Sequence, residues 1–162
     1  CYKRKSFREI PHLYNKIIEM KPKTYSKSIK KIFISQPWNF MGLSDKSLKR
    51  LAHLLVKNNI DTYISHPRED KSFFADKYLH LTSLFVIDTN HPVEEFVNFL
   101  SELSDSIEVY TFASGACLEL SEKVPVNLFN ILDSGEFHES QESLKKILRN
   151  REIEFSVLEP QI

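Results

Sequence analysis

The stretch KIFISQPWNFMGLSDKSLKRLAHLLVKNNIDTYIS, residues 31–65, decides the fold of this chain. Residues 31–36 alternate apolar and polar side chains and predict a strand. Ser44 is a good N-cap for a helix over residues 45–58, where leucines recur at helical spacing and form one apolar face. Residues 60–65 predict a second strand, so the whole stretch indicates two parallel strands joined by a crossover helix.

The rest of the chain repeats this alternation of strands and helices. We expect further strands over 83–88, 107–112 and 126–132, a helix after His91-Pro92, a short helix ending near Val124, and a final helix over 141–151. Segment 70–82 is ambiguous. This order predicts an α/β fold: a three-layer αβα Rossmann-like domain over residues 30–162, with a mainly parallel sheet of about five strands.

Charge is distributed unevenly along the chain, although the net charge is zero over 162 residues. Residues 1–31 hold ten Lys or Arg and two Glu, a net of +8, so residues 32–162 carry −8. We interpret residues 1–29 as a basic helical lead-in, broken at Pro11 and Pro22. Such a segment either contacts an anionic membrane surface or is simply solvated. The zero total gives no general attraction to nucleic acid.

The two cysteines, Cys1 and Cys117, do not make a disulfide framework. Cys117 lies in an apolar run and is expected to be a buried, reduced thiol, which favours a reducing compartment such as the cytoplasm. The sequence has no signal-peptide pattern and no run of 18 apolar residues.

His66-Pro67 is the first candidate for chemistry. It follows the second strand of the deciding stretch, and ligands of open α/β sheets bind at the carboxyl ends of the strands. Pro67 restricts the backbone of His66, which holds the imidazole in one place. An imidazole there can donate a hydrogen bond or a proton to an anionic group near neutral pH. The alternative is a structural histidine at a strand end.

Ser114-Gly115 is the second candidate. It follows the strand over 107–112 and leads into a short helix, whose first N–H groups are expected to form an anion site with the Ser114 hydroxyl. The alternative is an ordinary N-cap, with Gly115 allowing close packing. Glycine-rich phosphate loops, Asp-x-Asp motifs and metal-ligand spacing of the six histidines are all missing from the sequence.

The string Tyr63-Ile-Ser-His-Pro-Arg-Glu69 resembles the His-Pro motif of bacterial sialyltransferases, in the form found in glycosyltransferase family 52. The resemblance extends from about Lys30 to Phe129 but depends chiefly on these seven residues. Members of the family are two-domain GT-B enzymes whose C-terminal domain binds the nucleotide. The resemblance therefore implies that this chain is the C-terminal half of a GT-B fold.

The same resemblance implies roles for individual residues. His66, with Pro67 beside it, would assist departure of CMP, and Asp45, 21 residues earlier, would be the base. Ser114 would bind the phosphate. Gly115 replaces the second hydroxyl common in the family, which Thr111 can supply only if its side chain faces the same side. For Asp45 the alternative is a helix-start residue favoured by the macrodipole.

Glu69 follows the histidine in the family string and can reach a ribose hydroxyl. The alternative for Glu69 is a salt bridge with Arg68 or Lys71.

The implied function is inverting transfer of sialic acid from CMP-sialic acid to a glycan acceptor of lipooligosaccharide or capsule, without metal or cofactor. The chain would be only part of the catalytic unit, in the cytoplasm or at the inner face of the cell membrane, with a homodimer left open. Two alternatives remain at this point: a family 52-like transferase that uses another sugar nucleotide, and a non-catalytic Rossmann-like interaction domain.

Overall fold

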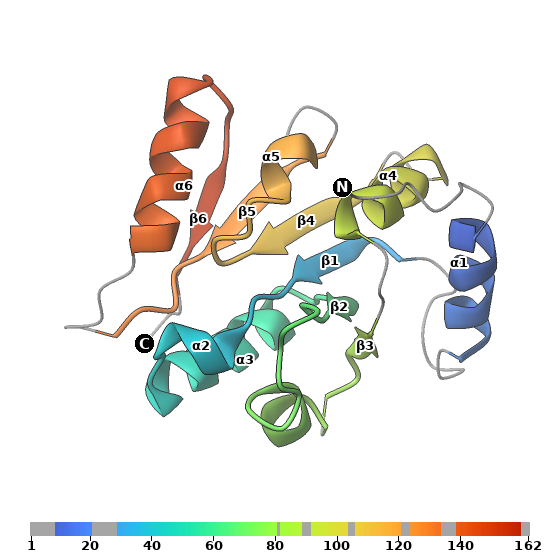
Figure 1. Ribbon diagram of the computed structural model, residues 1–162, viewed down its shortest axis with the longest axis horizontal. Coiled ribbons are helices and arrows are strands. Elements are labelled where there is room, and N and C mark those ends of the chain that lie inside the picture. Colours follow the sequence, from blue (N-terminus) through green and yellow to red (C-terminus); the bar gives the residue numbers. More distant parts are fainter. Residues whose placement is uncertain are drawn as a thin grey trace.

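The computed structural model describes residues 9–20, 29–80, 82–88, 92–103, 106–120, 124–133 and 139–159. Within these ranges, strands and helices alternate along the chain (Figure 1). The strands are β1 (Lys31–Ile34), β2 (Thr62–Ile64), β3 (Phe85–Ile87), β4 (Glu108–Thr111), β5 (Val126–Phe129) and β6 (Ser156–Leu158). The helices are α1 (Glu9–Met20), α2 (Trp38–Met41), α3 (Asp45–Lys57), the π-helical turn η1 (Ala75–Leu79), α4 (Val93–Leu103), α5 (Cys117–Leu120) and α6 (Glu139–Asn150).

The strands form one sheet in the order β3-β2-β1-β4-β5-β6, and every neighbouring pair is parallel. This order confirms the predicted α/β Rossmann-like fold, with β6 added to the expected strands. From β1 the chain builds outward through β2 to β3, then returns to place β4 on the other side of β1. The sheet therefore has its topological switch point between β1 and β4.

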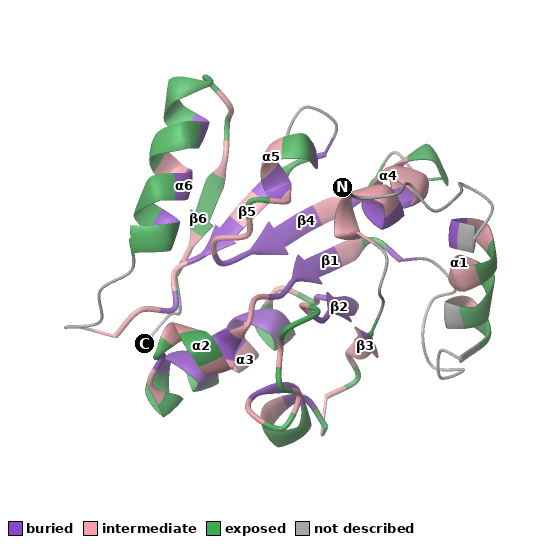
Figure 2. Ribbon diagram, in the orientation of Figure 1, coloured by how far each residue is buried: buried purple, intermediate pink, exposed green. Residues whose placement is uncertain are grey.

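Helices cover both faces of the sheet, which gives three layers (Figure 1). Helix α3 and the turn η1 pack on one face, while α1, α4, α5 and α6 lie on the other. Side chains along β1 alternate between these faces: Phe33 packs beneath α3, and Ile32 and Ile34 pack beneath α4. The central strands are accordingly buried, and the outward faces of the helices are exposed (Figure 2).

An aromatic cluster centred on Phe33 fills the layer beneath α3. The Phe33 ring is stacked against Tyr63 and Phe129, each with ring centroids 5.5 Å apart, and against Trp38 at 6.3 Å. Phe33, Tyr63, Trp38 and Phe129 are fully buried. Offset aromatic pairs of this kind stabilise a core beyond their buried area, so β1, β2 and β5 are held together from one side.

Helix α3 confirms the helix predicted from residue 45. Ser44 has an extended backbone, and its Oγ accepts a hydrogen bond from the N–H of Ser47 at 3.2 Å, as an N-cap does. The preceding helix α2 ends at Gly42, whose φ of +67° lies in the left-handed region that glycine adopts without strain. The end of α2 at Gly42 and the start of α3 at Ser44 together set the direction in which the chain leaves β1.

The lead-in helix packs onto the domain instead of standing apart from it. Ile10 is buried against the α4 side, and the rings of Tyr14 and Phe99 meet edge to face at 5.6 Å. The predicted break at Pro11 is wrong. Pro11 lies in the first turn of α1, where backbone N–H groups have no acceptor within the helix, so the N–H that proline lacks costs the helix no hydrogen bond. Residues 1–8 and 21–28, including Pro22, and His91 lie outside the described residues. No helix in the described part of the chain has the length and hydrophobicity needed to cross a membrane.

We predict that Ser44→Ala lowers the free energy of unfolding by about 1 kcal/mol, because the N–H of Ser47 loses its acceptor at the start of α3. Ser143→Ala, an exposed substitution inside α6, is the matched control and should change stability by less than about 0.5 kcal/mol. Urea unfolding curves of both variants measure the difference. Equal stability of the two would show that the cap does not hold this helix.

Candidate functional site

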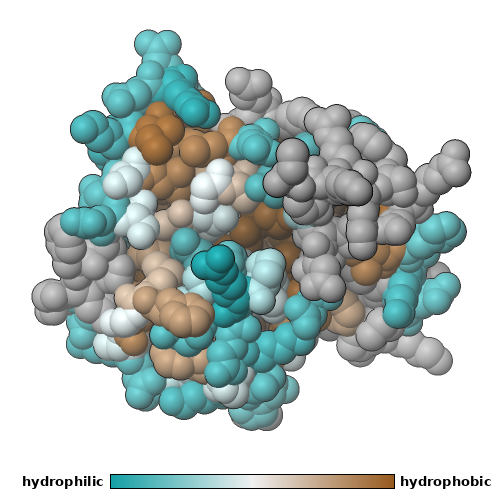
Figure 3. Space-filling view, in the orientation of Figure 1, coloured by the Kyte–Doolittle hydropathy of each residue, from teal (hydrophilic) through white to brown (hydrophobic). Residues whose placement is uncertain are grey.

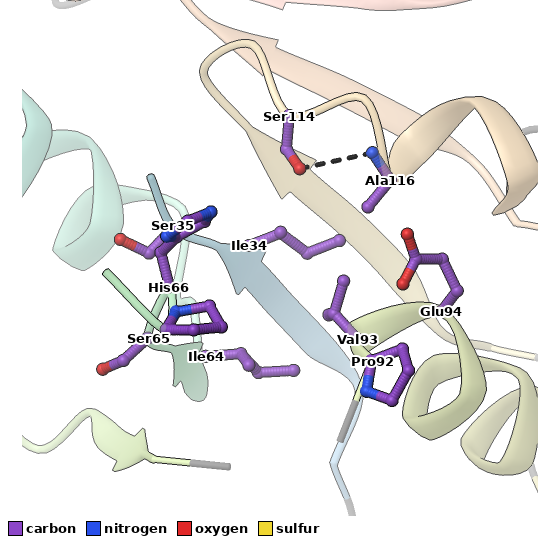
Figure 4. A pocket seen from close by; sticks show the side chains of 11 residues that line it. Ile34, Ser35, Ile64, Ser65, His66, Pro92, Val93, Glu94, Ser114 and Ala116 are labelled. Atoms are coloured by element: carbon purple, nitrogen blue, oxygen red, sulfur yellow. Dashed lines mark hydrogen bonds between the residues drawn. The ribbon is translucent and has the colours of Figure 1, made fainter. Parts of the chain in front are cut away.

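A pocket of about 320 Å³ lies at the carboxyl ends of β1, β2 and β4, next to the start of α4. In Figure 3 hydrophobic side chains are visible in the hollow beside the ends of β1 and β4. Figure 4 shows Ser114 and Ala116 on one wall, Ser65 and His66 on another, and Pro92 to Glu94 on a third. The lining residues are Ile34, Ser35, Ile64, Ser65, His66, Pro67, Pro92, Val93, Glu94, Ser114 and Ala116.

The position of the pocket brings His66 and Ser114 together. The two residues follow different strands, β2 and β4, on opposite sides of β1. Both line the same pocket at the switch point, where open α/β sheets bind their ligands. Pro67 also lines it.

A backbone hydrogen bond selects one tautomer of the His66 imidazole. Its Nδ1 accepts a hydrogen bond from the backbone N–H of Arg68 at 3.1 Å. In the neutral ring the proton is then on Nε2, which is left as a donor. Partial burial, together with the positive charge of Arg68, lowers the pKa of His66 below 6.5. At neutral pH the residue is therefore a neutral Nε2–H donor.

The loop after β4 is held by hydrogen bonds within the chain. The hydroxyl of Thr111 donates to the Ile34 carbonyl at 3.0 Å and accepts the N–H of Ser114 at 3.2 Å. The N–H of Ala113 binds Gln36 Oε1, and the N–H of Ala116 binds Ser114 Oγ (Figure 4). These three N–H groups already have acceptors within the chain and are not left to bind an anion, and the anion site expected at the start of the short helix stays a prediction.

This wall of the pocket offers a ligand the hydroxyl of Ser114 and the open space beside Gly115. A serine oxygen that accepts a hydrogen bond still has its own hydrogen to donate. Gly115 is exposed, and a Cβ added there would meet nothing within 4 Å. Close packing within the chain therefore does not require this glycine. Thr111 is fully buried and outside the lining set, so it is a link between β4 and β1 and does not supply a second phosphate hydroxyl.

Glu69 is turned toward the interior, away from the position expected for a ribose contact. Its Oε2 accepts from Ser35 Oγ at 2.7 Å and from the N–H of His66 at 3.1 Å, and its Oε1 accepts from the hydroxyl of Tyr63. Glu69 makes these contacts in place of the salt bridge expected with Arg68 or Lys71. Lys71 pairs with Asp88 instead, at 2.7 Å between Nζ and Oδ2. Burial raises the pKa of Glu69 above its ordinary value of 4.5, although its hydrogen bonds oppose the shift.

Asp45 lies at the start of α3, outside the set of residues that line the pocket. Its side chain is 71% exposed, and its Oδ1 is 3.4 Å from Lys77 Nζ and 3.3 Å from the Tyr78 hydroxyl. These contacts fit the alternative of a helix-start residue. A role for Asp45 as a catalytic base stays a prediction of the resemblance.

Glu94 is the lining residue that sequence reasoning missed. It lies in the first turn of α4, half-buried, and its carboxylate faces the pocket near Ala116 (Figure 4). Acidic residues are common in first turns because of the helix macrodipole, so the sequence alone gave no reason to single it out. The available signal was its position just after a predicted strand, at the same edge as His66.

Among the residues that the structure describes, no group of three or more His, Cys, Asp or Glu side chains is arranged to hold a metal ion. The chemistry available in the pocket is that of one neutral imidazole, several hydroxyls and one carboxylate. This set can donate to an anion on one side and accept from hydroxyls on the other.

We predict that the pKa of His66 lies below 6.5 and that the neutral imidazole carries its proton on Nε2. The cause is the Arg68 N–H, which occupies Nδ1, together with partial burial. Because the folded pKa is lower than the unfolded one, His66 contributes stability above the unfolded pKa that is lost as the pH falls. Long-range ¹H–¹⁵N correlation spectra recorded from pH 4 to 8 measure both properties. A protonated Nδ1 in the neutral ring would contradict the assignment.

No protein-family model matches this chain, and no curated protein matches it. The likeness of residues 63–69 to sialyltransferases of family 52 is therefore that of a short motif within a Rossmann-like domain, and membership in the family stays a prediction.

Proposed function

We propose that the domain binds the nucleotide of a sugar nucleotide in this pocket, and that it is the CMP-sialic-acid-binding half of an inverting sialyltransferase. The observation that carries the proposal is that His66 and Ser114, from opposite sides of β1, line one pocket at the switch point. The choice of CMP over other nucleotides comes from the resemblance of residues 63–69 and from nothing else in the chain.

His66 would act on the phosphate of the leaving group. As the bond between sialic acid and the phosphate breaks, negative charge grows on the phosphate oxygen. A fixed Nε2–H donor beside that oxygen stabilises the charge more in the transition state than in the ground state. The lowered pKa makes hydrogen-bond donation by a neutral ring, and not full proton transfer, the role that fits His66. Ser114 would donate to the same phosphate.

Glu94 would bind the ribose. A carboxylate repels a phosphate, so the phosphate belongs on the wall of His66 and Ser114, away from the carboxylate. Hydroxyls, in contrast, are good donors to a carboxylate, and acidic residues of Rossmann folds bind ribose hydroxyls in this way. Placing the ribose diol against Glu94 therefore gives His66, Ser114 and Glu94 each a partner of the right kind.

Titration calorimetry with CMP, cytidine and UDP tests the proposal. We expect CMP to bind with a Kd in roughly the micromolar to millimolar range, where enzyme KM values lie. His66→Ala should weaken CMP binding about tenfold or more and leave cytidine binding unchanged, because cytidine lacks the phosphate that His66 contacts. His53→Ala, an exposed histidine of α3 outside the lining set, is the matched control.

The other outcomes of this titration separate the alternatives. Stronger binding of UDP than CMP would indicate a transferase that uses another sugar nucleotide. Failure of both nucleotides to bind the folded domain would reject the proposal in favour of a non-catalytic interaction domain.

The assignment of Glu94 makes a separate prediction. The wild type should bind CMP about tenfold more tightly than 2′-deoxy-CMP, and this ratio should fall to about one in Glu94→Ala, because the carboxylate that accepts from the 2′-hydroxyl is gone. Glu95→Ala, the neighbouring first-turn residue outside the lining set, should keep the wild-type ratio. A gain in affinity for both nucleotides in Glu94→Ala would show that the carboxylate faces the phosphate instead.

A further inference from the structure

A hydrogen-bonded network lies directly beneath the turn that carries His66. Its centre is the carboxylate of Glu69, which binds Ser35 through Oε2 and Tyr63 through Oε1. The hydroxyl of Tyr63 also contacts Ser35 Oγ and accepts the indole N–H of Trp38 at 2.9 Å. Ser35, Tyr63 and Trp38 are all at least 99% buried. The network therefore joins the end of β1 to β2 inside the core.

The same carboxylate controls the backbone at His66. Its Oε2 accepts the N–H of His66, while the N–H of Glu69 returns to the His66 carbonyl at 2.9 Å. Residues 66 to 69 thus form a closed turn, and within it the N–H of Arg68 reaches Nδ1 of the imidazole. The orientation of the ring depends on the turn, and the turn depends on the carboxylate.

We propose that Glu69 is the positioning residue of the site, fixing the His66 turn to Ser35 at the end of β1 so that Nε2–H is presented to the pocket. A role in stability alone does not explain the arrangement. Burying a carboxylate without a cationic partner is costly, and an apolar side chain could fill the space. A carboxylate side chain can, however, accept two hydroxyls and a backbone N–H at once, which an apolar side chain cannot. What His66 does once it is in place rests on the proposed function.

The test compares Glu69→Gln, Glu69→Ala and Ser35→Ala in the domain without ligand. In Glu69→Ala the turn loses its anchor, so the His66 Nδ1 resonance should move from that of an unprotonated nitrogen toward the average of two tautomers. Glu69→Gln keeps an acceptor oxygen of the same reach and should restore most of the wild-type signature. Ser35→Ala removes one anchor by a small change in the core and should shift the same resonance in the same direction.

Asp70→Asn is the matched control. Asp70 is the residue after the turn, and its carboxylate accepts hydrogen bonds within its own loop, from Ser72 N and Oγ. This variant should leave the His66 resonances unchanged, which shows that a shift in the Glu69 variants is not a general response to a changed turn.

The same variants are then titrated with CMP and cytidine. Loss of positioning should weaken CMP binding by about tenfold in Glu69→Ala, as removal of a supporting residue does at other sites, with cytidine affinity unchanged. Wild-type His66 resonances in folded Glu69→Ala would overturn the inference. If Glu69→Ala does not fold, wild-type resonances in Ser35→Ala would overturn it. Failure of the wild type to bind CMP would instead reject the proposed function, and the ligand-free spectra would still decide the role of Glu69.

Discussion

The parallel pairing of β1 with a strand on each side is the constraint on which the rest of this structure depends. The connection that leaves β1 goes to α3 on one face of the sheet, whereas the connection that leaves its neighbour β4 goes to α5 on the other face. Loops that diverge in this way leave a crevice above the sheet edge. The pocket, the placement of His66 and Ser114 on its walls and the entry of α4 at its rim all follow from this topology.

Polar side chains then make the edge rigid. Thr111 joins β4 to the last carbonyl of β1, Gln36 holds the N–H of Ala113, and Glu69 holds both Ser35 and the His66 turn. The contacts of Thr111, Gln36 and Ser35 join segments that are distant in sequence, whereas Glu69 and His66 belong to one turn. The ionised form of Glu69 is the costly one, since burial raises its pKa. The contribution of this shift to stability is accordingly fully present below the unfolded pKa of Glu69 and is lost as the pH rises through its raised pKa.

The sequence predicted the layers of this fold better than its site. Leucines at helical spacing behind Ser44 specify α3 locally, and the β1 and β2 patterns place Phe33 and Tyr63 in one core, so these elements needed no tertiary information. Strand β6 was missed, although Ile153, Phe155 and Val157 alternate, because a three-residue edge strand with exposed residues has a weak hydrophobic signal. The inward turn of Glu69 and the pocket-facing position of Glu94 depend on contacts between distant segments. A single sequence does not encode those contacts as a pattern, so the ribose contact was expected from Glu69, which does not line the pocket.

The position of Trp38 has a spectroscopic consequence. Trp38 is the only tryptophan of the chain, and it is fully buried with its indole N–H donated to Tyr63. Indole emission responds to the polarity and hydrogen bonding around the ring, and here it comes from one ring in one environment. The fluorescence of the native protein is therefore an intrinsic optical probe of the interior beneath His66, with no label and no change to the sequence.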